Sequence, residues 1–148
     1  MPGDDFARPA HILLVEDNPG DVRLMREAFA ELEVRTHLHV ASNGESALAF
    51  IRRQGDYRHA PWPDLILLDL SLPGRDGRAV LAEIKSDPQL RRIPVVVLTS
   101  SQEQDDIARA YDLNVNSYIA KPRDLEEFIH VARGIEAFWL RVVKLPKE

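Results

Sequence analysis

The sequence contains no cysteine among its 148 residues, which excludes disulfide bridges, thiolate metal centres and cysteine nucleophiles. It also lacks any apolar run near the about 20 residues that a membrane-spanning helix needs. Residues 1–7 have neither the basic start nor the apolar core of a signal peptide. We therefore expect a soluble, cytoplasmic protein with no membrane contact.

Excess positive charge is missing as well. The net charge is −5, whereas nucleic-acid-binding domains carry basic surfaces that neutralise phosphates, so we expect no nucleic-acid partner. What remains is an ordinary globular composition, 45% hydrophobic and 29% charged. We expect one domain over residues 1–148, with a core at about 10–140 and a short C-terminal extension at 139–148.

Short apolar runs alternate with amphipathic segments along the chain. Three of these runs, 12–15, 65–68 and 95–98, are apolar throughout, which is typical of parallel strands buried on both faces. With right-handed crossovers, the alternation predicts a (βα)₅ three-layer α/β sandwich, the flavodoxin-like architecture. The last helix is predicted from residue 125 to about residue 140.

Polar residues follow four of the five predicted strands. Strand one ends in Glu16 and Asp17, strand three in Asp69, strand four in Thr99, and strand five in Lys121. In an open parallel sheet these positions share the C-terminal edge, where α/β proteins bind ligands. If the strand order is 2-1-3-4-5, as in doubly wound relatives of this architecture, three carboxylates converge beside the lysine and the threonine.

Three carboxylates in one crevice repel each other, by about 1 kcal/mol per pair in water and about 4 kcal/mol at an effective dielectric of 20. A hard cation such as Mg²⁺ neutralises oxygen-only ligands of this kind and leaves a carboxylate free as a nucleophile. An ammonium and a hydroxyl at the same edge suit a phosphoryl group. A single acidic residue such as Asp17 has a simpler alternative role as a helix cap.

These segments resemble the receiver domain of two-component response regulators. The matching runs are LLVEDN at 13–18, DLILLDLSLPGRDG at 64–77, IPVVVLTS at 93–100 and YIAKP at 118–122. The connector 55–63 and the tail 134–140 also resemble the small stand-alone regulators of bacterial phytochrome kinases. The resemblance implies a cognate histidine kinase, of the phytochrome type, and an unknown downstream protein reached by protein contact.

The resemblance also implies a role for each site residue. Asp69 is the phospho-acceptor and a metal ligand; Glu16, Asp17 and the backbone carbonyl of Ser71 complete the Mg²⁺ site. Lys121 pairs with the phosphoryl group, while Thr99 and Tyr118 form the switch. Pro122 is expected to follow a cis peptide bond that aims Lys121 into the site.

We expect a phosphorelay acceptor with self-phosphorylation and self-dephosphorylation chemistry only, not an enzyme. One alternative is an aspartyl-nucleophile phosphatase, although that class needs an acid where Ser71 stands. A flavin module would need a hydroxyl- and glycine-rich loop in place of residues 16–19. A third alternative is a scaffold receiver that takes no phosphate.

The last predicted helix is apolar on two sides. The second side carries Val131, Phe138 and Val142. With Trp139 from the core side, these residues are candidates for a homodimer surface; a well-buried final helix explains them equally well. On the second predicted strand, His37 and His39 alternate, and we interpret them as the polar face of an edge strand rather than a metal pair.

Overall fold

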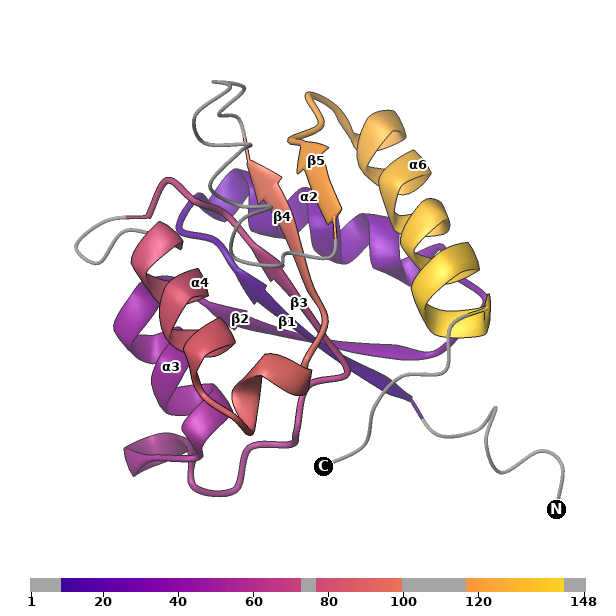
Figure 1. The fold of residues 1–148 in the computed structure, drawn as a ribbon. Coiled ribbons are helices and arrows are strands. Elements are labelled where there is room, and N and C mark those ends of the chain that lie inside the picture. The colour runs from indigo at the N-terminus through magenta and orange to yellow at the C-terminus, as the bar shows by residue number, and fades with distance from the viewer. Residues whose placement is uncertain (1–8, 73–76, 100–116, 143–148) are drawn as a thin grey trace, which may run out of the picture.

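The computed structural model describes residues 9–72, 77–99 and 117–142. Within these ranges, five parallel strands form one sheet in the order β2-β1-β3-β4-β5, which confirms the predicted fold and strand order. Helices α2 and α6 cover one face of the sheet, and α3 and α4 cover the other (Figure 1). The strands are β1 (Ala10–Val15), β2 (Thr36–Ala41), β3 (Leu65–Leu68), β4 (Val95–Thr99) and β5 (Ser117–Ala120).

The helices begin close to the residues where the sequence predicts them. They are α2 (Pro19–Ala30), α3 (Gly44–Arg52), α4 (Gly77–Ser86) and α6 (Leu125–Ile135), with short 3-10 turns η1 (Gly55–Tyr57) and η2 (Leu90–Arg92). The helix predicted between the fourth and fifth strands lies outside the described residues. No helix in the described ranges is long and apolar enough to cross a bilayer.

The apolar strands owe their continuous pattern to burial on both faces. In β1, Leu13 and Val15 pack with α3 and α4, while Ile12 and Leu14 pack with α2 and α6. All four residues of β3 are fully buried between the same two layers. Polar side chains are therefore excluded from β3 and from residues 12–15 of β1, and they appear where these two strands end.

Asparagine and aspartate side chains start three of the helices. The Asn18, Asn43 and Asp124 side chains each accept a hydrogen bond from a backbone N–H in the first turn of α2, α3 and α6. Such a cap typically contributes about 1 kcal/mol. The cap of α2 is thus Asn18 and not Asp17, because Asn18 directly precedes Pro19 at the first helical position.

The final helix differs from the single α-helix predicted to about residue 140. The α-helical hydrogen bonding of α6 ends at Ile135, and the chain continues as a π-helix, η3 (Glu136–Val142). Two contacts hold the junction: Glu136 Oε2 accepts a hydrogen bond from the Val34 backbone N–H at 2.7 Å, and the Trp139 side chain is buried in the core. These contacts join the helix to residues distant in sequence, and the periodicity of apolar residues within the helix does not predict such contacts.

Candidate functional site

The polar residues that follow the strands meet at the C-terminal edge of the sheet. Lys121 lies at their centre, with its Nζ 2.6 Å from Glu16 Oε1, 2.9 Å from Asp69 Oδ2 and 3.0 Å from Asp21 Oδ2. One ammonium thus binds three carboxylates: one follows β1, one follows β3 and one lies in α2. The strand order brings them together because β1 and β3 are neighbours in the sheet.

Each of the two buried carboxylates is held by both of its oxygens. Glu16 Oε1 faces Lys121 while Oε2 accepts a hydrogen bond from the Asn18 backbone N–H at 3.1 Å. Asp69 Oδ2 faces Lys121 while Oδ1 accepts from the Ser71 backbone N–H at 3.0 Å. The loops that follow β1 and β3 therefore orient these carboxylates through their own backbone.

Carboxylate oxygens of Glu16, Asp17 and Asp69 lie within 4.8 Å of one another. Glu16 and Asp69 are only 3% and 4% exposed, whereas Asp17 is exposed, so the cluster opens to solvent on one side. All three donors are oxygen, which suits a hard divalent cation such as Mg²⁺ or Mn²⁺. The residues present fit the metal site that the sequence predicts.

Burial and hydrogen bonding act on the pKa values of this cluster. Burial raises the pKa of Glu16 to about 7, and the neighbouring Asp69 carboxylate acts in the same direction. Burial alone would lower the pKa of Lys121, but the hydrogen bonds that its ammonium donates to Glu16, Asp69 and Asp21 outweigh burial and raise that pKa. Lys121 is therefore a permanent cation among carboxylates that outnumber it.

A glycine allows the first residue of α4 to lie against the backbone of residues 69 and 70. A Cβ atom on Gly77 would lie 2.6 Å from Leu70 Cα and would also collide with the backbone carbonyl oxygen of Asp69. The Gly77 backbone N–H donates to the Leu70 carbonyl oxygen at 3.1 Å. The first residue of α4 thus contacts the backbone of the candidate phospho-acceptor itself.

Sequence reasoning missed the positions of Asp21 and Gly77 in this site. An acidic residue in the first turn of a helix has an ordinary explanation in the helix dipole, so Asp21 carries no signal of its own. Gly77 stands within a matching run, but its need for close backbone approach appears only once the loop is closed.

The remaining predicted site residues have mixed outcomes. Thr99 ends β4 opposite Ala120 of β5, and its side chain lies outside the described residues. Tyr118 is half-buried against the core between the sheet and α3 and α4. Ser71 contributes its backbone N–H to Asp69, and the metal role of its carbonyl stays a prediction.

The prediction of a cis bond before Pro122 is wrong. The described residues contain no cis peptide bond, so Lys121 is joined to Pro122 by a trans bond. Lys121 nevertheless reaches Glu16 and Asp69, so the lysine does not need a cis bond to enter the site. A trans bond is also the lower-energy form, by roughly 0.5–1 kcal/mol before proline.

The candidate dimer residues divide between the core and the surface. Trp139 is 8% exposed and belongs to the core shared with α2, whereas Phe138 is 54% exposed. Val131 is half-buried beside them, and the Val142 side chain lies outside the described residues. A hollow of about 340 Å³ lies beside Phe138 and is lined by Ile119, Val131 and Trp139 among others.

The fold and this site define a class of protein. Residues 12–133 match the response regulator receiver domain, and the chain belongs to that family. It is 48% identical over 143 residues to the response regulator Rcp1 of Synechocystis, covering 97% of each chain. It is also 42% identical over 133 residues to a probable methanogenesis regulatory protein, FilR2, of Methanothrix harundinacea, covering 89% of this chain and 84% of that one.

Solved structures of phytochrome response regulators share the architecture. The phosphorylated cyanobacterial phytochrome response regulator RcpA has a TM-score of 0.90 at 51% identity, covering 95% of this chain and 100% of that one. The Mn²⁺-bound form of Rcp1 has a TM-score of 0.88 at 49% identity, covering 94% and 100%. This chain is thus a response regulator receiver similar to the regulators of phytochrome signalling.

Proposed function

We propose that the chain accepts a phosphoryl group on Asp69 from the phosphohistidine of a histidine kinase, in a Mg²⁺-dependent reaction. The supporting observation is the setting of Asp69: a buried carboxylate, bound by Lys121 and by the Ser71 N–H, beside the carboxylates of Glu16 and Asp17. The family membership, and the phosphorylated state of the similar regulator RcpA, also support the proposal.

In the proposed reaction, an Asp69 carboxylate oxygen forms a bond to phosphorus as the phosphorus–nitrogen bond of the phosphohistidine breaks. The electron pair of that bond stays on the imidazole nitrogen of the kinase. Glu16, Asp17, Asp69 and the Ser71 carbonyl would hold Mg²⁺, whose charge offsets that of the phosphoryl oxygens. Positioning and charge neutralisation carry most of such a transfer. Water then hydrolyses the acyl phosphate at the same site, which restores the carboxylate and releases inorganic phosphate.

Lys121 links this chemistry to a change of state. In the structure its ammonium binds Glu16, Asp21 and Asp69 together. Phosphorylation of Asp69 replaces the single negative charge of the carboxylate with the nearly two negative charges of a phosphoryl group. The phosphoryl oxygens compete for the ammonium and weaken its contacts with the other two carboxylates. We infer that this rearrangement, with Thr99 and Tyr118, biases a two-state switch; a shift from 1:99 to 99:1 would need about 5.5 kcal/mol.

The partners follow from the relatives and from the exposed aromatic. Similarity to RcpA, a phytochrome response regulator by description, supports a phytochrome-type kinase as the phosphodonor and a protein as the downstream target. The exposed Phe138, beside the hollow at Val131, supports a homodimer in which this aromatic is covered by a second copy. Val142 would extend the same surface.

Incubation with acetyl phosphate, followed by intact-mass measurement, tests the proposal. We expect one added phosphoryl group in the presence of Mg²⁺ and none after chelation. Asp69→Asn should abolish labelling, while Asp56→Asn, which changes an exposed aspartate in η1, should leave it intact. Full labelling of Asp69→Asn would contradict the assignment, and no labelling of the folded wild-type chain would favour a scaffold role.

A further inference from the structure

Three histidines converge at the end of the sheet opposite the carboxylate site. His11 is the second residue of β1 and lies in register with His37, the second residue of β2. His39 stands two residues further along β2, so its side chain faces the same side of the sheet as His37. These are three of the chain's five histidines, and the sequence places His11 well away from the other two.

Their ring nitrogens are close enough to share a ligand. His11 Nδ1 lies 3.0 Å from His39 Nε2, and one nitrogen from each of the three rings lies within 4.8 Å of the others. Nitrogens bound to one tetrahedral zinc ion at its usual bond lengths stand about 3.3 Å apart. The 3.0 Å separation of His11 and His39 is close to that value, and the nitrogen of His37 lies no more than 4.8 Å from either.

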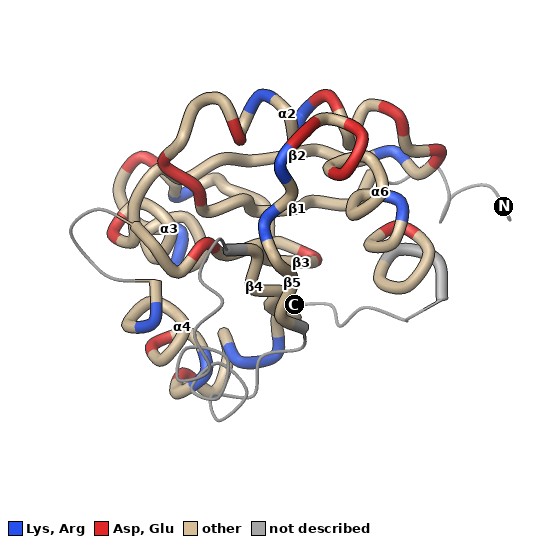
Figure 2. Tube along the Cα trace, turned by 90° about the horizontal axis from the view of Figure 1, so that it is seen from above, with Lys and Arg blue, Asp and Glu red and all other residues tan. Residues whose placement is uncertain are grey.

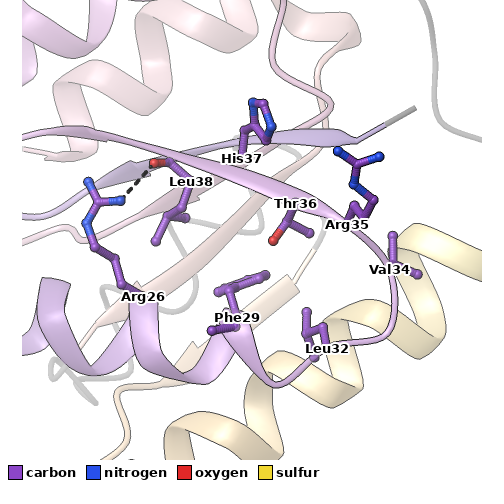
Figure 3. A pocket seen from close by; sticks show the side chains of 9 residues that line it. Arg26, Phe29, Leu32, Val34, Arg35, Thr36, His37 and Leu38 are labelled. Atoms are coloured by element: carbon purple, nitrogen blue, oxygen red, sulfur yellow. Dashed lines mark hydrogen bonds between the residues drawn. The ribbon is translucent and has the colours of Figure 1, made fainter. Parts of the chain in front are cut away.

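The cluster is reachable from solvent. His37 is exposed, and His11 and His39 are half-buried. Figure 3 shows the hollow between α2 and β2, where His37 points away from Phe29 and Leu38, toward the other face of the strand. The exposed His37 leaves an open path to the nitrogens that His11 and His39 turn toward each other.

Charged residues of both signs lie on the neighbouring elements. Asp64 Oδ2 accepts a hydrogen bond from the His11 backbone N–H at 2.8 Å. Arg26 in α2 donates a hydrogen bond to the Leu38 carbonyl oxygen of β2 at 3.3 Å. A negative charge thus lies beside the backbone of one histidine, and a positive charge lies beside the strand that carries the other two.

We propose that His11, His37 and His39 form a binding site for a divalent transition-metal ion of the zinc class, with water at the fourth position. Imidazole ligands select zinc, nickel or copper over Mg²⁺, so the two ends of the sheet would bind metals of different chemistry. A metal here joins the edge strand β2 to β1. The hydrogen bond between His11 and His39 joins two of the rings, and a metal ion would join all three.

Zinc titration of the full chain by calorimetry, with Mg²⁺ saturating the carboxylate site, tests the proposal. We expect one zinc ion per chain and a rise in Tm, because a ligand that binds the folded state stabilises it. Co²⁺ in place of zinc should give the visible absorption bands of a tetrahedral site with nitrogen ligands.

Substitutions of the proposed ligands are compared with substitutions of the two other histidines of the chain. His37→Ala removes an exposed ligand without disturbing the core. Loss of an outer-shell partner typically weakens metal binding about 10- to 100-fold, and loss of this direct ligand should weaken zinc binding by more than that. His39→Gln should do the same. His59→Ala and His130→Ala, which remove exposed histidines elsewhere, should change nothing. Absence of zinc binding to the wild-type chain, or less than a tenfold change in His37→Ala and His39→Gln, would overturn the proposal.

Discussion

At the scale of single residues, the site depends on one lysine that forms ion pairs with several carboxylates. Lys121 touches three carboxylates, and each buried carboxylate keeps its second oxygen on a backbone N–H. No local pattern in the sequence reports this arrangement. The positions of Lys121 and Asp69 were nevertheless predictable, because both residues directly follow strands whose ends must share one edge of a parallel sheet.

Glu16 should make the stability of the metal-free protein depend on pH. Its pKa is about 7 in the folded chain against an ordinary 4.5, so between these pH values the folded state binds more protons than the unfolded state. The free energy of unfolding should therefore fall as pH rises from about 4.5 to about 7. Urea denaturation at several pH values, with chelator present, measures this slope.

Glu16→Gln should remove that contribution, because glutamine does not titrate. Glu31→Gln, at an exposed position, should retain the wild-type slope. Equal slopes in the wild-type chain and Glu16→Gln would show that ionisation of Glu16 carries no folding penalty.

At the scale of elements, each helix begins just beyond the strand edge that carries the site. Asn18 starts α2 and also donates its backbone N–H to Glu16, so one residue caps the helix and orients the carboxylate. Gly77 starts α4 against the backbone of Asp69. Helix starts and site geometry are therefore parts of the same local structure.

Gly77→Ala should destabilise the fold, because the new Cβ would meet backbone atoms of residues 69 and 70 that cannot rotate away. We expect a loss of about 1–3 kcal/mol, as for overpacked cores, together with slower labelling of Asp69. Gly134→Ala is the matched control: its Cβ would have nothing within 4 Å, so helix propensity should stabilise it by up to about 1 kcal/mol. Urea denaturation of both variants measures the difference in sign, and equal effects would contradict this account.

At the scale of the whole molecule, an exposed aromatic side chain stands out from the charged surface of the helices. Acidic and basic residues are interspersed along the described helices in the view of Figure 2, whereas the exposed Phe138 follows α6 in η3. Together with the apolar side chains that line the hollow beside it, Phe138 forms the surface on which the homodimer is proposed.

Phe138→Ala should shift the chain toward the monomer, because it removes the exposed aromatic from the proposed homodimer surface. Size-exclusion chromatography with light scattering, with and without acetyl phosphate, measures the mass. Arg133→Ala, at an exposed position in α6, should leave the mass unchanged. A monomeric mass for the wild-type chain under both conditions would remove the homodimer.

The sequence by itself determined the strands, their burial and the edge of the sheet where the carboxylates and the lysine gather. Uninterrupted apolar runs such as residues 65–68 are removed from water only when helices cover both faces of the sheet. Charged residues near these runs are then confined to the strand ends. That pattern is local, and it is strong enough to place Glu16, Asp69 and Lys121 at one edge.

Only the tertiary structure decided which distant side chains meet. Asp21 joins Lys121, Glu136 reaches Val34, and His11 meets His37 through the register of β1 and β2. Contacts of this kind depend on how strands and helices are aligned across the sheet, and hydrophobic periodicity within one segment carries no record of that alignment.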